Sequence, residues 1–171
     1  MGIYRYGTFL LLASLLFCCS LVAQDDKMIY ASPATTKSAG MPIVPSCMTV
    51  AALHGDYTKG AATLLLKFTS GCKVPWHWHT AAENIILVSG KGKIEMKDGP
   101  SHAMKATDYA YLPAKQPHQF TCTTACIMYD LPDGAFDIHY IDKDGKEIPP
   151  EQALKSSTKG AKPASKATKK M

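Results

Sequence analysis

Three histidines and one glutamate are spaced so that they could bind a metal ion. His77, His79 and Glu83 follow the pattern H-x-H-x3-E, and His118 lies further along the chain. Successive side chains of a β-strand point to opposite faces, so His77 and His79 share a face if their stretch is extended. A turn near residues 80–82 would bring Glu83 beside them. Imidazoles with a carboxylate predict a site for Zn, Fe, Mn, Ni or Cu.

The two segments that contain these residues resemble the sequence motifs of the cupin superfamily. Residues 71–90 match every fixed position of the first motif, G-x5-H-x-H-x3-E-x6-G. Residues 107–122 resemble the second, G-x5-P-x-G-x2-H-x3-N, at Pro113 and His118. The resemblance spans roughly residues 45–130. It implies an all-β jelly-roll barrel (a double-stranded β-helix), one divalent metal ion (Fe, Mn, Ni, Cu or Zn) and an enzyme of the cupin dioxygenase kind.

The second segment departs from its motif at three positions. Thr107, Lys115 and Cys122 stand where the family usually has Gly, Gly and Asn. None of the three is a predicted ligand. The departures therefore concern the geometry of local turns more than metal binding.

The pattern of apolar runs independently predicts one all-β domain, at residues 46–148 of a chain of 171. Turns rich in Gly, Pro and Asp separate the apolar runs. No stretch between residues 47 and 141 keeps the 3.6-residue period of a helix over the length of an ordinary helix. A polar arm, residues 24–45, precedes the domain, with one short strand expected at Met28–Ala31. The expected strands of the domain are 47–53, 62–69, 84–89, 92–97, 101–105, 108–112, 117–122, 126–131 and 135–141.

The first 23 residues have the features of a cleaved signal peptide. Arg5 precedes an apolar run, and residues 21–23 form an acceptable cleavage site. The run is too short for a comfortable membrane span, so we expect no transmembrane anchor after cleavage and a secreted or periplasmic protein. A lipoprotein modified at Cys18 or Cys19 is the alternative, which Phe17 disfavours.

The net charge of +5 comes from the end of the chain. Residues 155–171 contain six Lys and no acidic residue, whereas residues 24–154 have 12 Lys against 14 acidic residues, a net −2. A mildly acidic domain argues against nucleic-acid binding. We expect residues 149–171 to form one helical turn and a disordered Lys-rich tail, which either aids solubility or adheres to an anionic surface.

Four cysteines remain after signal removal, and an even number in an exported chain indicates disulfides. Three pairings are open. A hairpin formed by residues 48–53 and 63–69 would bring Cys47 close to Cys72, and Cys122 and Cys126 would face each other across a short loop. The rival interpretation makes Cys122 and Cys126 metal ligands or a redox pair.

Strand alternation also predicts which other residues line the site. Gln116, Phe120 and Cys122 share the parity of His118, while Ile85 and Leu87 share that of Glu83, giving a mostly apolar pocket for a small molecule. Tyr109 and Tyr111 either reach the metal or only pack on their strand. We expect Trp76 and Trp78 outside the barrel, and His54, His102 and His139 in solvent. The strand 135–141, with Asp137 and Asp142, is an edge strand or forms a homodimer contact rather than a second metal site.

Three functions fit this site. The first is an exported mononuclear metal enzyme that acts on a small organic molecule. The second is a non-catalytic module that binds a metal or small molecule, similar to zinc-sensing cupin-like domains. In the third, the metal is purely structural and the barrel is an interaction scaffold.

Overall fold

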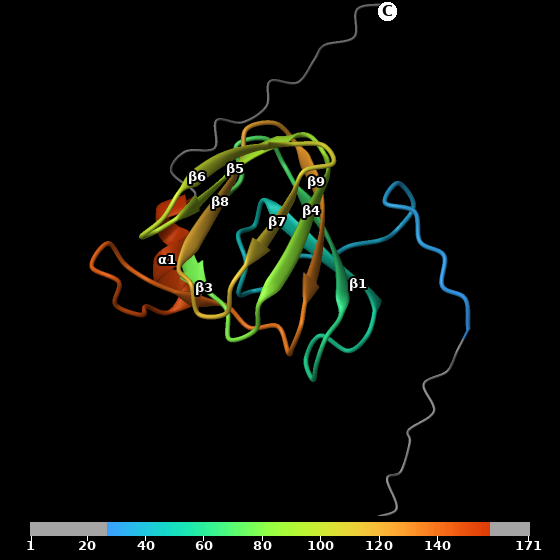
Figure 1. Cartoon of the computed structure of the whole chain (residues 1–171), viewed down its shortest axis with the longest axis horizontal. Helices are drawn as coiled ribbons and strands as arrows, with labels where there is room; N and C mark the ends of the chain where they lie inside the picture. Colours follow the sequence, from blue (N-terminus) through green and yellow to red (C-terminus); the bar gives the residue numbers. More distant parts are fainter. Residues whose placement is uncertain (1–26, 158–171) are drawn as a thin grey trace, which may run out of the picture.

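Two antiparallel five-stranded sheets face each other in the computed structural model, which describes residues 27–157 (Figure 1). The first sheet has the order β1 (Met48–His54), β2 (Thr63–Phe68), β9 (Cys126–Pro132), β4 (Glu83–Ser89), β7 (Tyr109–Leu112). The second has the order β10 (His139–Tyr140), β3 (Lys73–Trp78), β8 (His118–Cys122), β5 (Lys91–Met96), β6 (Ser101–Lys105). This arrangement confirms the predicted all-β jelly roll. The predicted signal peptide and most of the Lys-rich tail lie outside the described residues.

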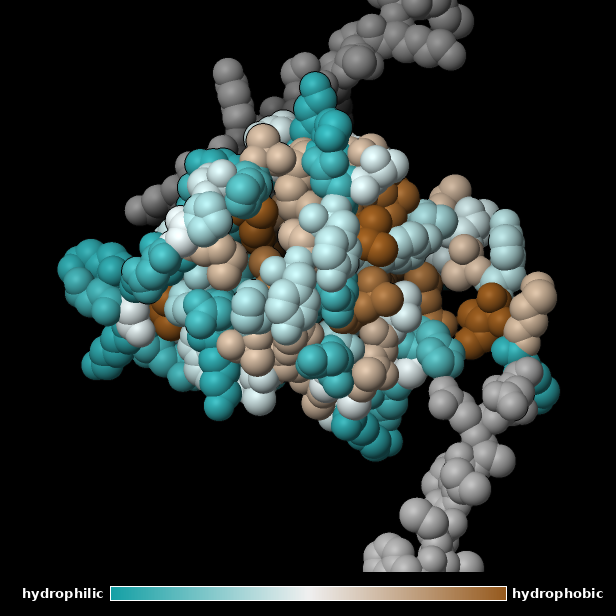
Figure 2. Space-filling view, in the orientation of Figure 1, coloured by the Kyte–Doolittle hydropathy of each residue, from teal (hydrophilic) through white to brown (hydrophobic). Residues whose placement is uncertain are grey.

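The core lies between the sheets because alternate side chains of their strands are apolar. Leu64, Leu66 and Phe68 point inward from β2, and the rings of Phe68 and Phe120 of the opposite sheet lie 5.7 Å apart. Burial of each such side chain contributes about 2 kcal/mol to the free energy of unfolding. The face shown in Figure 2 is mostly hydrophilic, as expected for a barrel that packs its apolar residues inside.

Three expected elements differ from the structure. Residues 28–31 form no strand, although the arm that contains them is attached to β1 by the bridge between Ala39 and Val50. The expected strand 135–141 is reduced to β10. The predicted helical turn near residue 150 is confirmed as a longer helix, α1 (Pro150–Ser157). Within residues 27–157, no helix has the length and apolar character needed to cross a membrane.

Two disulfides confirm the pairing that the hairpin geometry favoured. Cys47 is bonded to Cys72, with Cα atoms 5.6 Å apart, and Cys122 to Cys126, with Cα atoms 6.0 Å apart. The first closes the open end of the β1–β2 hairpin against β3. The second joins the end of β8 to the start of β9. The metal-ligand and redox interpretations of Cys122 and Cys126 are therefore replaced by a structural one.

We predict that the two disulfides contribute unequally to stability. A cross-link between Cys47 and Cys72, at a sequence separation of 25, restricts the unfolded chain more than one between Cys122 and Cys126, at a separation of 4. Replacing the first pair by Ala should therefore lower the free energy of unfolding by about 3.5 kcal/mol, and the second pair by about 2 kcal/mol. Urea unfolding measures both. An equal or reversed loss would contradict this explanation.

The turns at Thr107 and Lys115 keep a glycine-like backbone without glycine. Their φ angles are 77° and 59°, in the left-handed region that glycine adopts without a steric penalty. Both residues stand at glycine positions of the second cupin motif. The two turns thus keep the backbone shape of the motif. The cost is steric strain at two residues that have a side chain where glycine has none.

Thr107→Gly should consequently stabilise the protein. Relief of left-handed strain in a β-branched residue exceeds the entropic cost of glycine, for a net gain of up to about 1 kcal/mol. Thr121→Gly is the matched control on β8, where φ is negative, and it should lose about 1 kcal/mol. Urea unfolding midpoints compare the two. A loss of stability in Thr107→Gly would show that the turn is unstrained.

Candidate metal centre

Three imidazoles converge inside the barrel from the second sheet. His77 lies on β3, His79 follows the end of β3, and His118 begins β8. His77 and His118 are directly opposite each other in the sheet, and their ring centroids lie 4.3 Å apart. One ring nitrogen from each of the three histidines falls within 4.8 Å of the others. These three residues are therefore positioned to hold a metal ion.

Glu83 approaches this group from the opposite sheet, where it begins β4. Its Oε2 atom lies 3.3 Å from Nε2 of His79 and 3.7 Å from Nε2 of His118. The four residues expected to act together are thus gathered in one buried place. The turn after His79 brings Glu83 back to them, as the spacing predicted.

A β-bulge in β3 aligns the first histidine with the core. The register of β3 against β8 shifts between Val74 and His77, so both side chains point inward although three positions separate them. Bulges commonly redirect side chains beside functional sites. His79 then follows His77 on the same face, as strand alternation predicted.

Backbone carbonyl groups fix the tautomer of each ring. Nδ1 of His77 donates to the oxygen of Pro75 at 2.6 Å, and Nδ1 of His118 donates to the oxygen of Gln116 at 2.9 Å. Nδ1 of His79 donates to the oxygen of Asp137. With the proton held on Nδ1, the lone pair of each Nε2 is free. This is the arrangement that orients metal-binding histidines.

The burial of the site keeps the imidazoles neutral. Burial, together with the neighbouring His118 and His79, holds the pKa of His77 well below its ordinary value. Burial likewise lowers the pKa of His79 to about 3 and lowers that of His118. Neutral imidazole is the form that binds metals. Burial and the nearby carboxyl group of Asp130 raise the pKa of Glu83 well above its ordinary value.

The site opens into a small apolar cavity of about 50 Å³. One water molecule needs roughly 10–15 Å³ of such volume, so the cavity has room for a few waters or one small molecule. Ile85 and Phe120 line it as predicted, whereas Leu87 and Cys122 are buried elsewhere in the core and do not line it. Gln116 is exposed and contributes only its carbonyl group. The other apolar lining residues are Val44, Met48, Leu66, Phe68, Val74, Ile94, Leu112, Met128, Phe136 and Ile138.

Asp130 is a site residue that the sequence analysis missed. It lies on β9, only 2% exposed, and it lines the cavity beside Glu83. The two carboxyl groups are within hydrogen-bonding reach of each other, and burial raises the pKa of Asp130 to about 7. Alternation along β9 was the available signal, since Asp130 shares the inward face of Cys126 and Met128.

The segment 133–138 crosses beside the site as an irregular strap, and the strand expected there is wrong. Its carboxylates bond to the turn that follows β3: Asp133 accepts from the amide of Ala82 at 2.9 Å, and Asp137 from that of Thr80 at 2.8 Å. Hydrogen bonds from backbone amides to these side chains thereby take the place of the backbone hydrogen bonds that a β-strand would make. Phe136 packs against His79, with ring centroids 5.3 Å apart.

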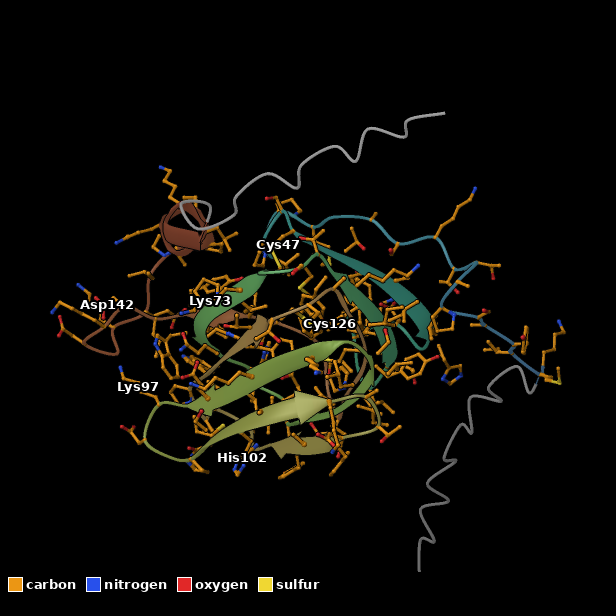
Figure 3. All side chains as sticks on the ribbon, turned by 90° about the horizontal axis from the view of Figure 1, so that it is seen from above. Cys47, Lys73, Lys97, His102, Cys126 and Asp142 are labelled. Atoms are coloured by element: carbon orange, nitrogen blue, oxygen red, sulfur yellow. A yellow bond between two sulfur atoms is a disulfide. The ribbon has the colours of Figure 1, made fainter. Side chains whose placement is uncertain are left out.

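The remaining aromatic and histidine residues lie away from the cavity. Tyr109 and Tyr111 are 60% and 55% exposed, so the proposal that they reach the metal is wrong. Trp78 stacks on His139 on the second sheet, with ring centroids 3.9 Å apart, so the expectation that His139 lies in solvent is wrong. His102 lies on the edge strand β6, exposed and on the outside of the barrel (Figure 3).

Comparison with known proteins identifies the family of the domain that contains the site. A family model described as a cupin domain matches residues 64–132, which include all four predicted ligands and Asp130. Residues 64–132 form a cupin domain. A search of the curated proteins finds no match.

Solved structures share the fold of this cupin at low sequence identity. The polyketide cyclase RemF from Streptomyces resistomycificus has a TM-score of 0.56 and 16% identity, over 75% of this chain and 99% of its own. An RmlC-like cupin from Shewanella frigidimarina has a TM-score of 0.54 and 17% identity, over 64% of this chain and 93% of its own. The Schizosaccharomyces pombe Cnp3 cupin domain has a TM-score of 0.54 and 12% identity, over 63% and 75%.

We predict that the strap supports the metal site of this cupin. Asp137→Ala removes the bond to Thr80 and loosens the carbonyl group that orients His79, so the affinity for zinc should fall about tenfold. Competition with a chelator measures it. Asp144→Ala, in an exposed turn, is the control and should bind zinc as the wild type does. Wild-type affinity in Asp137→Ala would show that the strap does not act on the ligand.

Proposed function

We propose that this cupin holds one divalent metal ion through His77, His79, His118 and Glu83, and that it is an enzyme acting on a small organic molecule. The orientation of the rings carries the proposal. Three Nδ1 atoms donate to backbone carbonyl groups, which leaves three Nε2 lone pairs converging beside a buried carboxylate. A site built only for packing would not require all three rings in the same tautomer.

The chemistry of the donor set favours a reactive metal. Three neutral imidazoles and one carboxylate leave a divalent ion with one positive charge and with coordination positions open for a substrate. When bound, such an ion would supply Lewis-acid chemistry or, with Fe, Mn, Ni or Cu, the activation of dioxygen. The protein contributes an apolar wall that limits access of water. A dioxygenase-like reaction is the proposed activity.

Export is part of the proposal. The two disulfides are typical of proteins that fold in an oxidising compartment. They agree with the signal peptide predicted at residues 1–23, and we propose a secreted or periplasmic location. A homodimer through the β10 edge stays a prediction.

A second candidate function is a non-catalytic binding module. The volume of the cavity, about 50 Å³, favours it, because few substrates fit without movement of the walls.

Oxygen uptake separates the two functions. Iron-loaded protein mixed with small enols, phenols and carboxylates should consume oxygen with at least one of them. Binding of these compounds without turnover would support the module.

The metal assignment predicts a selective loss in single variants. His77→Ala, His118→Ala and Glu83→Ala should each lose most of the bound metal in elemental analysis, since each removes one ligand. The β-rich circular dichroism spectrum should persist because the surrounding core is apolar. His102→Ala is the matched control, as His102 is exposed on β6. Full metal occupancy in the three ligand variants would contradict the assignment.

A further inference from the structure

A residue that lines the cavity has a buried carboxylate oxygen without a hydrogen-bond partner. Among the described residues, two buried side-chain oxygen atoms lack one: Oε1 of Gln119 and Oδ1 of Asp130. Gln119 does not line the cavity of the metal centre, whereas Asp130 does. An unpaired buried carboxylate oxygen is costly, so its presence beside a predicted metal centre points to a role with a ligand.

Asp130 is placed next to the centre without belonging to its compact set of ligands. On β9 it faces Ile85 of β4 and Leu64 of β2, so the central strand of the sheet fixes its position. The compact group of possible ligands contains the three histidines, and Glu83 contacts two of them through its Oε2 atom. The carboxyl group of Asp130 instead pairs with that of Glu83.

The surroundings determine what the free oxygen can bind. Among the described residues that line the cavity, the polar side chains are Asp130, Glu83 and the three histidines, and the rest are apolar. The unpaired oxygen keeps an accepting lone pair whichever carboxyl group of the pair carries a proton. An O–H donor to this oxygen must therefore come from a molecule in the cavity, either water or a bound ligand.

We propose that Asp130 selects small hydroxy acids as ligands of this cavity. The inference rests on the proposed metal centre, whose single positive charge favours a carboxylate. The hydroxyl group of the ligand donates to Asp130, and its short carbon chain contacts the apolar wall. A two-carbon or three-carbon hydroxy acid suits a cavity of about 50 Å³.

The test uses cobalt-loaded protein, whose visible spectrum reports ligand binding at the metal. Glycolate is the probe, and propionate, matched to it in size but without the hydroxyl group, is the control ligand. Wild-type protein should prefer glycolate. In Asp130→Leu the preference should fall about tenfold, because the acceptor is lost. Propionate reports any steric effect of Leu, so the ratio of the two affinities isolates the hydroxyl contact.

Asp130→Asn is the conservative variant. Its amide can donate to Glu83 while its Oδ1 remains an acceptor, so the preference should stay within about threefold of wild type. This variant also keeps the test informative if Asp130→Leu folds poorly.

Each contrary outcome has a distinct meaning. If Asp130→Leu binds cobalt and keeps the wild-type ratio of glycolate affinity to propionate affinity, the hydroxy-acid inference is overturned and the metal centre is left intact. Loss of cobalt from that variant would assign Asp130 to metal binding and also overturn the inference. A wild-type protein that binds no cobalt would contradict the proposed function together with everything that rests on it.

Discussion

Three backbone carbonyl groups hold the imidazoles of this cupin in one tautomer, and the rest of the site depends on them. They come from different places: Pro75 in the β3 bulge, Gln116 before β8, and Asp137 in the strap. Each accepts the proton of Nδ1 and leaves Nε2 free toward the centre. The fold therefore has to fix a bulge, a turn and an irregular segment relative to one another.

The two sheets provide that rigidity in different ways. The second sheet carries His77 and His118 on neighbouring strands, so the spacing of these two follows from strand pairing, and His79 directly follows the end of β3. The first sheet supplies both carboxyl groups, Glu83 from β4 and Asp130 from the adjacent β9. Metal ligation would thus join the two faces of the barrel through its interior. The disulfides stabilise the surrounding strands, and the left-handed turns at Thr107 and Lys115 keep their shape without glycine.

Strand alternation and a short turn suffice to predict the convergence of His77, His79 and Glu83. The resemblance to the second cupin motif added His118 to them. Sequence reasoning missed Asp130, which falls inside the expected strand 126–131, because a lone acidic residue in a strand belongs to no motif that marks it as part of a site. The strap was mistaken for a strand because its apolar residues alternate. Asp133 and Asp137 bond instead to the amides of the turn at residues 80–82, a tertiary contact that no local pattern reveals.

The central claim is that the three histidines and Glu83 bind one metal ion in the barrel. The X-ray absorption spectrum of the purified protein, prepared without chelator, tests it most directly. Ligation by these four residues predicts a metal surrounded only by nitrogen and oxygen, with the multiple-scattering pattern of about three imidazoles. A sulfur shell, or a spectrum without imidazole scattering, would contradict it.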